Sequence, residues 1–159
     1  MAQRIGIGYD IHRRAEGRPL WLGGVLFESP WGLEGHSDAD VLLHAVADAL
    51  LGAVALGDIG KHFPPDDPKW ENASSLDLLR MVRALLDGRN AKIVNVDATL
   101  IAEAPRLGPV RDQKRLNIAQ ALHVGARQVS VKATTNETLG ALGRGEGIAA
   151  LAIAAVELP

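Results

Sequence analysis

Three side chains of this sequence have the types and the spacing of a metal site. Asp10 and His12 are separated by a single residue, and His44 lies further along the chain in an apolar stretch. On an extended strand, residues i and i+2 point to the same side, so Asp10 and His12 would share one face. With an imidazole from a helix they would give Zn²⁺ three ligands and an open fourth position. An open position is typical of catalytic zinc, because structural zinc is normally closed by four protein ligands.

The residues around His44 predict a buried helix over 38–52. Ser37 followed by Asp40 has the pattern of a capping-box helix start. Asp40, His44 and Asp48 stand at i, i+4 and i+8, which makes one polar stripe on an otherwise apolar helix. Buried polar groups need partners, and a metal with carboxylates supporting its imidazole would provide them. The alternative is that His44 is a hydrogen-bonded core histidine.

The rest of the pattern predicts intermixed strands and helices in one domain spanning residues 1–159. Strands are predicted over 4–12, 94–100 and 129–134, a hairpin over 20–27 that turns at Gly23-Gly24, and helices over 74–88 and 109–122. In the first strand the two faces would carry Ile5, Ile7, Tyr9 and Ile11 on one side and Gly6, Gly8, Asp10 and His12 on the other. Periodicity does not separate helix from strand for the alanine-rich run 147–157. The fold class is therefore α/β or α+β.

Two further segments suggest binding chemistry. The connection 57–73 is long, proline-rich and charged, so it is either functional or a solvated surface loop. The segment 133–140 leaves a strand with Thr134, Thr135 and Glu137, which could offer N–H groups and hydroxyls to phosphate and a carboxylate to a hard cation. Alternatively, the Thr-Thr pair only caps a helix. The glycine-rich segment 143–147 does not match a phosphate-binding loop of the GxxxxGK[ST] type and could be a plain turn.

Composition excludes several classes of protein. The 159 residues are 47% apolar and 23% charged with a formal net charge of -2, and the basic residues form no cluster, which argues against nucleic-acid binding. Cysteine is absent, so disulfides and thiolate chemistry are excluded. The N-terminus begins directly with a strand-like pattern, and no apolar run is long enough to cross a membrane. A cytoplasmic protein is expected.

Taken together, several motifs in order resemble one family, the 2-C-methyl-D-erythritol 2,4-cyclodiphosphate synthases. The motifs are GYDIH at 8–12, HSDAD at 36–40 with LLHAVADALLGA to 53, LGDIGKHFPPDDP at 56–68, IAEAPR at 101–106 and KATTNETLGALGRGEGIA at 132–149. The resemblance implies a phosphorus–oxygen lyase of non-mevalonate isoprenoid synthesis. Its substrate would be 4-diphosphocytidyl-2-C-methyl-D-erythritol 2-phosphate, whose own 2-phosphate attacks the β-phosphorus and releases CMP.

The resemblance also implies roles for residues. Zinc would be held by Asp10, His12 and His44, and a Mg²⁺ or Mn²⁺ ion by Glu137. His36 and Thr135 would be catalytic, because they match residues that stabilise the transition state. The substrate-binding residues would be Asp10, His12, His36, Ser37, His44, Asp58, Ile59, Gly60, Phe63, Asp67, Ala102, Ala104, Pro105, Arg106, Leu107, Gly108, Thr134, Thr135, Glu137, Ala141 and Arg144.

The implied fold is a small mixed sheet with helices on one face, forming a homotrimer around a three-fold axis with active sites between subunits. The 147–157 run is then a strand. Tyr9, Ala141, Arg144 and Glu146 would lie near a central cavity that holds an isoprenoid diphosphate in some members. Pro65, Arg106 and Ala141 depart from residues common in the family.

Two other functions are compatible with the metal ligands alone. A mononuclear zinc hydrolase would use zinc-bound hydroxide on an ester or phosphate. A non-catalytic trimeric binding module would use the metal only for structure.

Overall fold

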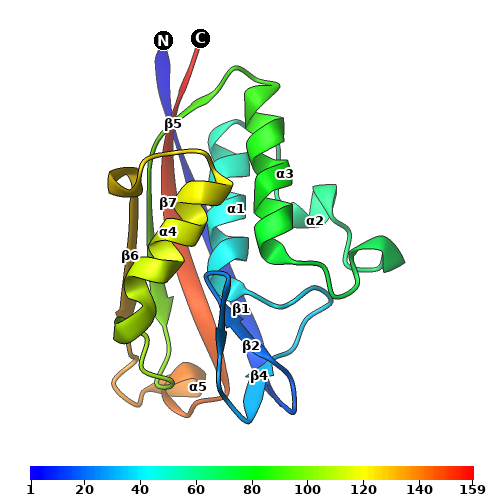
Figure 1. Cartoon of the computed structure of the whole chain (residues 1–159), viewed down its shortest axis with the longest axis vertical. Coiled ribbons are helices and arrows are strands. Elements are labelled where there is room, and N and C mark those ends of the chain that lie inside the picture. Colours follow the sequence, from blue (N-terminus) through cyan, green and yellow to red (C-terminus); the bar gives the residue numbers. More distant parts are fainter.

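A five-stranded mixed sheet is the framework of the protein. The computed structural model describes residues 1–159, apart from the side chain of Pro109. The strands are β1 (Ala2–Glu16), β4 (Trp31–Leu33), β5 (Lys92–Ile101), β6 (Val129–Thr134) and β7 (Gly147–Leu158), in the order β4-β1-β7-β5-β6. Only the β5–β6 pair is parallel among these neighbours. Because β1 and β7 are antiparallel partners along most of their length, the two chain termini lie together at one end (Figure 1).

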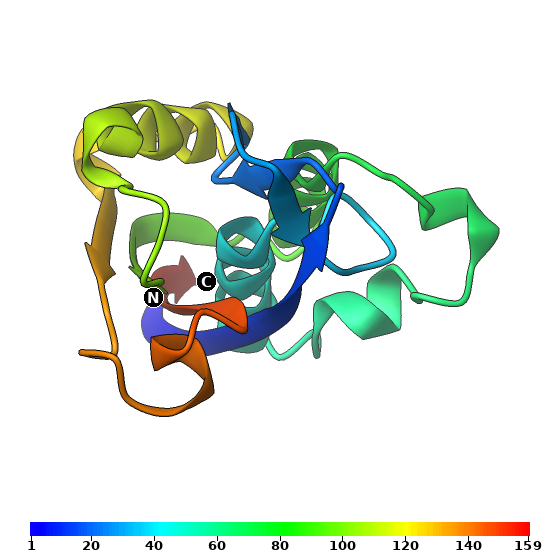
Figure 2. The ribbon, with the colours of Figure 1, turned by 90° about the horizontal axis from the view of Figure 1, so that it is seen from below.

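Three helices cover one face of this sheet (Figure 2). They are α1 (Val41–Ala53), α3 (Ser75–Asp87) and α4 (Arg111–Ala121), of which α1 lies directly on β1 and β7. The shorter elements are the hairpin of β2 (Leu20–Leu22) and β3 (Val25–Phe27), the helices α2 (Ile59–His62) and α5 (Gly140–Gly143), and the 3-10 turns η1 (Pro68–Trp70), η2 (Gly108–Val110) and η3 (Ala126–Gln128). Across the described residues, every helix is too short or too polar to span a bilayer.

The contact between α1 and β1 depends on two glycines. A Cβ atom on Gly8 would lie 1.8 Å from the carbonyl oxygen of Ala45, and one on Gly6 would lie 1.9 Å from that of Ala49. The helix backbone therefore touches the strand backbone, with no side chain between them. This close approach also brings the next residues on this face of β1, Asp10 and His12, beside the first turn of α1.

The opposite face of the sheet is apolar and exposed. Ile5 is 74% exposed and Ile7 70%, although both belong to a strand that pairs with β7 along this stretch. The other exposed apolar side chains of this face are Tyr9, Ile11, Leu151 and Ile153. The predicted alternation along β1 is confirmed, and its apolar side faces away from the helices.

Most predicted elements are confirmed, with two corrections. The helix expected over 38–52 begins at Val41, because Ala39 has a left-handed φ of 58° and Asp40, not Ser37, supplies the N-cap. The helix expected over 109–122 is split into η2 and α4. The alanine-rich 147–157 run is strand β7, as the family resemblance implied.

We expect Gly8→Ala to destabilise the protein, because its Cβ can be accommodated only if α1 moves away from the sheet. Overpacking of this kind costs about 1–3 kcal/mol. Gly52→Ala is the matched control, since Gly52 is an exposed residue of the same helix whose Cβ would meet nothing closer than 4.0 Å. Alanine should stabilise α1 there by roughly 0.5–1 kcal/mol. Urea unfolding of both variants measures the difference, and equal stabilities would contradict the close contact.

Candidate functional site

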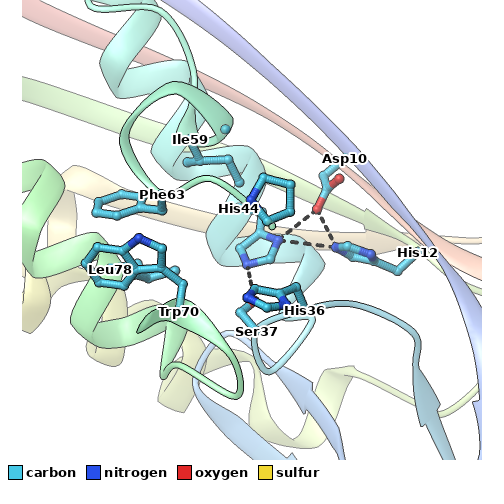
Figure 3. Close-up of a pocket in the computed structure, with 11 residues that line it drawn as sticks. Asp10, His12, His36, Ser37, His44, Ile59, Phe63, Trp70 and Leu78 are labelled. Carbon is cyan, nitrogen blue, oxygen red and sulfur yellow. Dashed lines mark hydrogen bonds and ion pairs between the residues drawn. The ribbon is translucent and has the colours of Figure 1, made fainter. Parts of the chain in front are cut away.

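Asp10, His12 and His44 converge on one point at the end of α1 (Figure 3). The Oδ2 atom of Asp10 lies 2.8 Å from Nε2 of His12 and 3.1 Å from Nδ1 of His44. The two imidazole nitrogens are 3.2 Å apart. The i, i+2 pair on β1 and the imidazole from the first turn of α1 therefore meet, as their spacing predicts.

This donor set fits a zinc ion. A tetrahedral zinc with ligand bonds of about 2.0–2.1 Å separates its donor atoms by about 3.3 Å, close to the three spacings of this cluster. Two imidazole nitrogens and one carboxylate oxygen, with no thiolate, make a site that suits a catalytic divalent metal. Asp10 and His12 remain partly exposed, so a fourth ligand can approach.

The far side of the His44 ring is held by two hydroxyl groups. Nε2 of His44 lies 2.9 Å from Oγ of Ser75 and 3.1 Å from Oγ of Ser37. The hydroxyl of Ser75 in turn hydrogen-bonds to the carboxylate of Asp38. These contacts orient the ring so that Nδ1 faces Asp10 and His12, which is the usual role of groups behind a metal-binding histidine.

The predicted support from Asp40 and Asp48 is wrong, because both carboxylates bind backbone N–H groups instead. Asp40 is fully buried and accepts hydrogen bonds from the amides of Gly23, Gly24 and Leu43 at 2.9, 2.8 and 3.1 Å. It therefore joins the β2–β3 hairpin to the start of α1. Asp48 accepts the Ile59 N–H at 2.8 Å and so positions α2 beside α1. Burial raises the pKa of both carboxyl groups.

The electrostatics of the cluster favour an ionised Asp10. Burial raises the pKa of Asp10, but the hydrogen bonds and charges of His12 and His44 outweigh this effect and lower the pKa to about 2. Burial lowers the pKa of His44, and the adjacent Asp10 carboxylate outweighs it, so the net shift is upward. Asp10 is thus an anion at neutral pH, which is the form that binds a cation.

The cluster forms the polar end of a pocket of about 200 Å³. Residues expected to bind substrate that line it are Asp10, His12, His36, Ser37, His44, Ile59, Gly60 and Phe63. Pro65, Trp70 and Leu78 also line it and were not expected, although an aromatic side chain in a polar connection was an available signal for Trp70. Its ring packs edge-on against Phe63 with centroids 5.0 Å apart. The long 57–73 connection is therefore a wall of the pocket.

Two acidic residues of this connection act as helix caps. The carboxylate of Asp58 accepts the Lys61 N–H at 3.0 Å at the start of α2, and that of Asp67 accepts the Lys69 N–H at 3.0 Å at the start of η1. The backbone carbonyl of Asp67 also lies 2.9 Å from Nε2 of His36 and fixes that ring.

The other expected binding residues lie elsewhere in the same chain. They are Ala102, Ala104, Pro105, Arg106, Leu107, Gly108, Thr134, Thr135 and Glu137, at the carboxyl ends of β5 and β6. Ile11, Ala149, Ile101 and Thr134 are successive partners across β1, β7, β5 and β6. Three steps between strands amount to about 14 Å. A single chain thus carries two separate groups of candidate residues at one end of its sheet.

Ala141 and Arg144 occupy a third position. Ala141 lines a second cavity of about 210 Å³ with Ile11, His12 and Glu146. Arg144 makes an ion pair with Glu146 of the same chain at 2.6 Å.

Comparisons with known proteins match this chain to one family along nearly its whole length. The model of the YgbB family matches residues 3–157. The 2-C-methyl-D-erythritol 2,4-cyclodiphosphate synthase of Symbiobacterium thermophilum is 59% identical, over 96% of this chain and 97% of that one. The synthase of Chlorobaculum tepidum is 58% identical, over 97% and 98%.

Solved structures of related enzymes have the same fold as this chain. The bifunctional IspDF from Campylobacter jejuni superposes with a TM-score of 0.95 at 39% identity, over 99% of this chain and 43% of that one. The Plasmodium falciparum IspF, solved as a CDP complex, superposes with a TM-score of 0.86 at 35% identity, over 99% and 97%.

A buried lysine, Lys114, hydrogen-bonds to the backbone of the 102–108 loop. Lys114 of α4 is only 1% exposed, and its Nζ donates to the carbonyl oxygen of Leu107 at 3.0 Å. The ammonium lies 5.1 Å from the ring centroid of Phe27, and the stem packs against Gly23, where a Cβ would be 2.6 Å from Cγ. Burial lowers the pKa of Lys114 to about 8.

This shift predicts a pH-dependent stability. Between about pH 8 and pH 10.5 the unfolded chain keeps the Lys114 proton that the folded chain loses, so the free energy of unfolding should rise with pH in this interval. The rise is on the order of 3 kcal/mol. Lys114→Met should lack it, whereas Lys92→Met, at an exposed lysine, should retain it. Urea unfolding across the interval tests this, and parallel curves for all three proteins would contradict it.

Proposed function

The chain belongs to the YgbB family, and on that basis we propose that it converts 4-diphosphocytidyl-2-C-methyl-D-erythritol 2-phosphate into 2-C-methyl-D-erythritol 2,4-cyclodiphosphate and CMP. It would be a phosphorus–oxygen lyase of the non-mevalonate isoprenoid pathway, and its relatives are named 2-C-methyl-D-erythritol 2,4-cyclodiphosphate synthases. The observation that carries the proposal is the convergence of Asp10, His12 and His44 at the polar end of a pocket in a chain that matches these relatives end to end.

The reaction needs no protein nucleophile. An oxygen of the substrate's 2-phosphate forms a bond to the β-phosphorus, and the bond from that phosphorus to the oxygen of the α-phosphate breaks. CMP leaves with that oxygen, and water is not consumed. Catalysis then consists of orienting the two phosphates and balancing their charge.

The residues of the pocket suit these tasks. A zinc ion held by Asp10, His12 and His44 would supply positive charge to a β-phosphate oxygen. His36, whose ring is held by the carbonyl of Asp67, faces the same space and would contact the phosphates. Ile59, Gly60 and Phe63 would hold the methylerythritol part against the apolar wall.

The second group of residues would bind the nucleotide. Glu137 is exposed just after β6 and would hold a Mg²⁺ or Mn²⁺ ion, which would supply positive charge to the phosphates, with Thr134 and Thr135 beside it. The loop residues Ala102, Ala104, Pro105, Arg106, Leu107 and Gly108 would surround the cytosine. Similarity to a relative solved as a CDP complex supports a cytidine ligand.

We propose further that the protein is a homotrimer whose active sites lie between subunits. A solvent-exposed apolar face that includes Ile5, Ile7 and Ile153 is typical of a protein interface. The strands beside the two groups of candidate residues, β1 and β6, are about 14 Å apart in the sheet of one chain, and a neighbouring copy would bring one group of each kind together. An isoprenoid diphosphate bound near Ala141 and Arg144 at the trimer axis stays a prediction.

Activity and metal content test the proposal together. We expect ³¹P NMR of the purified protein with the cytidylyl substrate to show the cyclic diphosphate and CMP. His12→Ala removes one of three ligands, so it should lose most of its zinc and nearly all turnover while remaining folded. Zinc analysis and circular dichroism check both points. Product that incorporates oxygen from water would instead indicate a zinc hydrolase, and binding without turnover would indicate a non-catalytic module.

Complementation between inactive subunits tests the shared site. His12→Ala disables only the zinc group, and Glu137→Gln disables only the second-cation group. A trimer that contains both variants has one interface where the two intact groups meet, so we expect about one third of wild-type turnover per mixed trimer. Co-expression with two affinity tags isolates these trimers. Activity no higher than that of the separate variants would show that each site lies within one chain.

A further inference from the structure

The carboxylate of Glu103 joins two loops that the proposed function assigns to different parts of the substrate. Glu103 follows β5 and is half-buried. Its Oε2 accepts the N–H of Asn136 at 2.8 Å, and its Oε1 accepts the N–H of Thr138 at 3.0 Å. Glu103 thus links the start of the 102–108 loop to the turn that follows β6.

The turn that Glu103 holds has an unfavourable backbone conformation. Glu137 has φ of 52° and Thr138 has φ of 63°, and a β-branched residue rarely adopts this left-handed region. Such residues persist only where the surrounding structure fixes them. They also cluster at functional sites, so a strained Glu137 indicates that its direction matters.

Side chains hold all three successive N–H groups of this turn. Glu103 accepts those of Asn136 and Thr138, and Oγ1 of Thr135 accepts that of Glu137 at 3.1 Å. Gly143 closes the turn from the other side, since a Cβ there would lie 2.2 Å from the backbone carbon of Thr138. Of these contacts, only the two from Glu103 come from a segment that follows another strand of the sheet, β5.

We propose that Glu103 is a positioning residue, whose carboxylate holds the 136–138 turn in the conformation that presents Glu137 to the second cation. The inference rests on the proposed function, because it takes Glu137 as a ligand. A carboxylate is required, since both of its oxygens accept a hydrogen bond. A glutamine has one acceptor oxygen, and its NH₂ group would face the remaining N–H donor.

Cation binding and turnover of Glu103→Gln test the role. We expect weaker Mn²⁺ binding in the presence of CDP, measured by calorimetry, and a turnover lowered about tenfold or more. Zinc content and thermal unfolding should stay close to wild type. Glu137→Gln is the reference for loss of the ligand itself, and Glu28→Gln is the matched control at an exposed glutamate.

A second substitution separates positioning from direct contact. Glycine adopts the left-handed region without strain. Thr138→Gly should therefore restore part of the Mn²⁺ affinity and turnover that Glu103→Ala loses. If Glu103 were itself a ligand of the cation, the double variant would be no better than Glu103→Ala, and the proposal would be overturned.

Wild-type behaviour of Glu103→Gln in both measurements would overturn the proposal as well. The Mn²⁺ measurement does not depend on turnover. A wild-type protein that makes no cyclic diphosphate, yet loses Mn²⁺ affinity on Glu103→Gln, would refute the proposed reaction and leave the role of Glu103 supported.

Discussion

The close approach of α1 to β1 is the constraint on which the rest of the structure depends. The carbonyl oxygens of Ala45 and Ala49 occupy the space that side chains at Gly8 and Gly6 would fill. With the helix at this distance, a short aspartate and two histidines can bring their donor atoms within 3.2 Å of one another. A larger residue at either glycine would separate the two sources of ligands, so the site depends on the packing beneath it.

Around this contact, carboxylates connect the chain by binding backbone amides. Asp40 joins the β2–β3 hairpin to α1, Asp48 joins α1 to α2, and Glu103 joins the ends of β5 and β6. Each carboxylate fixes a loop from a different element. The fold thus positions these loops with short, directional contacts, which suits the proposed reaction, since it relies on orienting phosphates rather than on a protein nucleophile.

The sequence correctly predicted the features that depend on local residue patterns. Alternation in β1 identified both the strand and the face that carries Asp10 and His12, and Ser74 marked the start of α3. It failed where tertiary contacts decide. Ser37 looked like the N-cap of α1, but the left-handed Ala39 and the amides of Gly23 and Gly24 assign that role to Asp40. The hydrogen bonds of Asp48, the burial of Lys114 and the place of Trp70 in the pocket likewise come from segments distant in sequence.

The exposed apolar face of β1 and β7 would make the specific activity depend on protein concentration. If this face is covered only in the assembled protein, subunits and sites form together, and the fraction of chains that belong to a complete site falls with dilution. Specific activity would then decline at low protein concentration although every chain is folded and Asp10, His12 and His44 are in place. Substrate that bridges two subunits would oppose this loss, because it binds the assembly and not the separate chain.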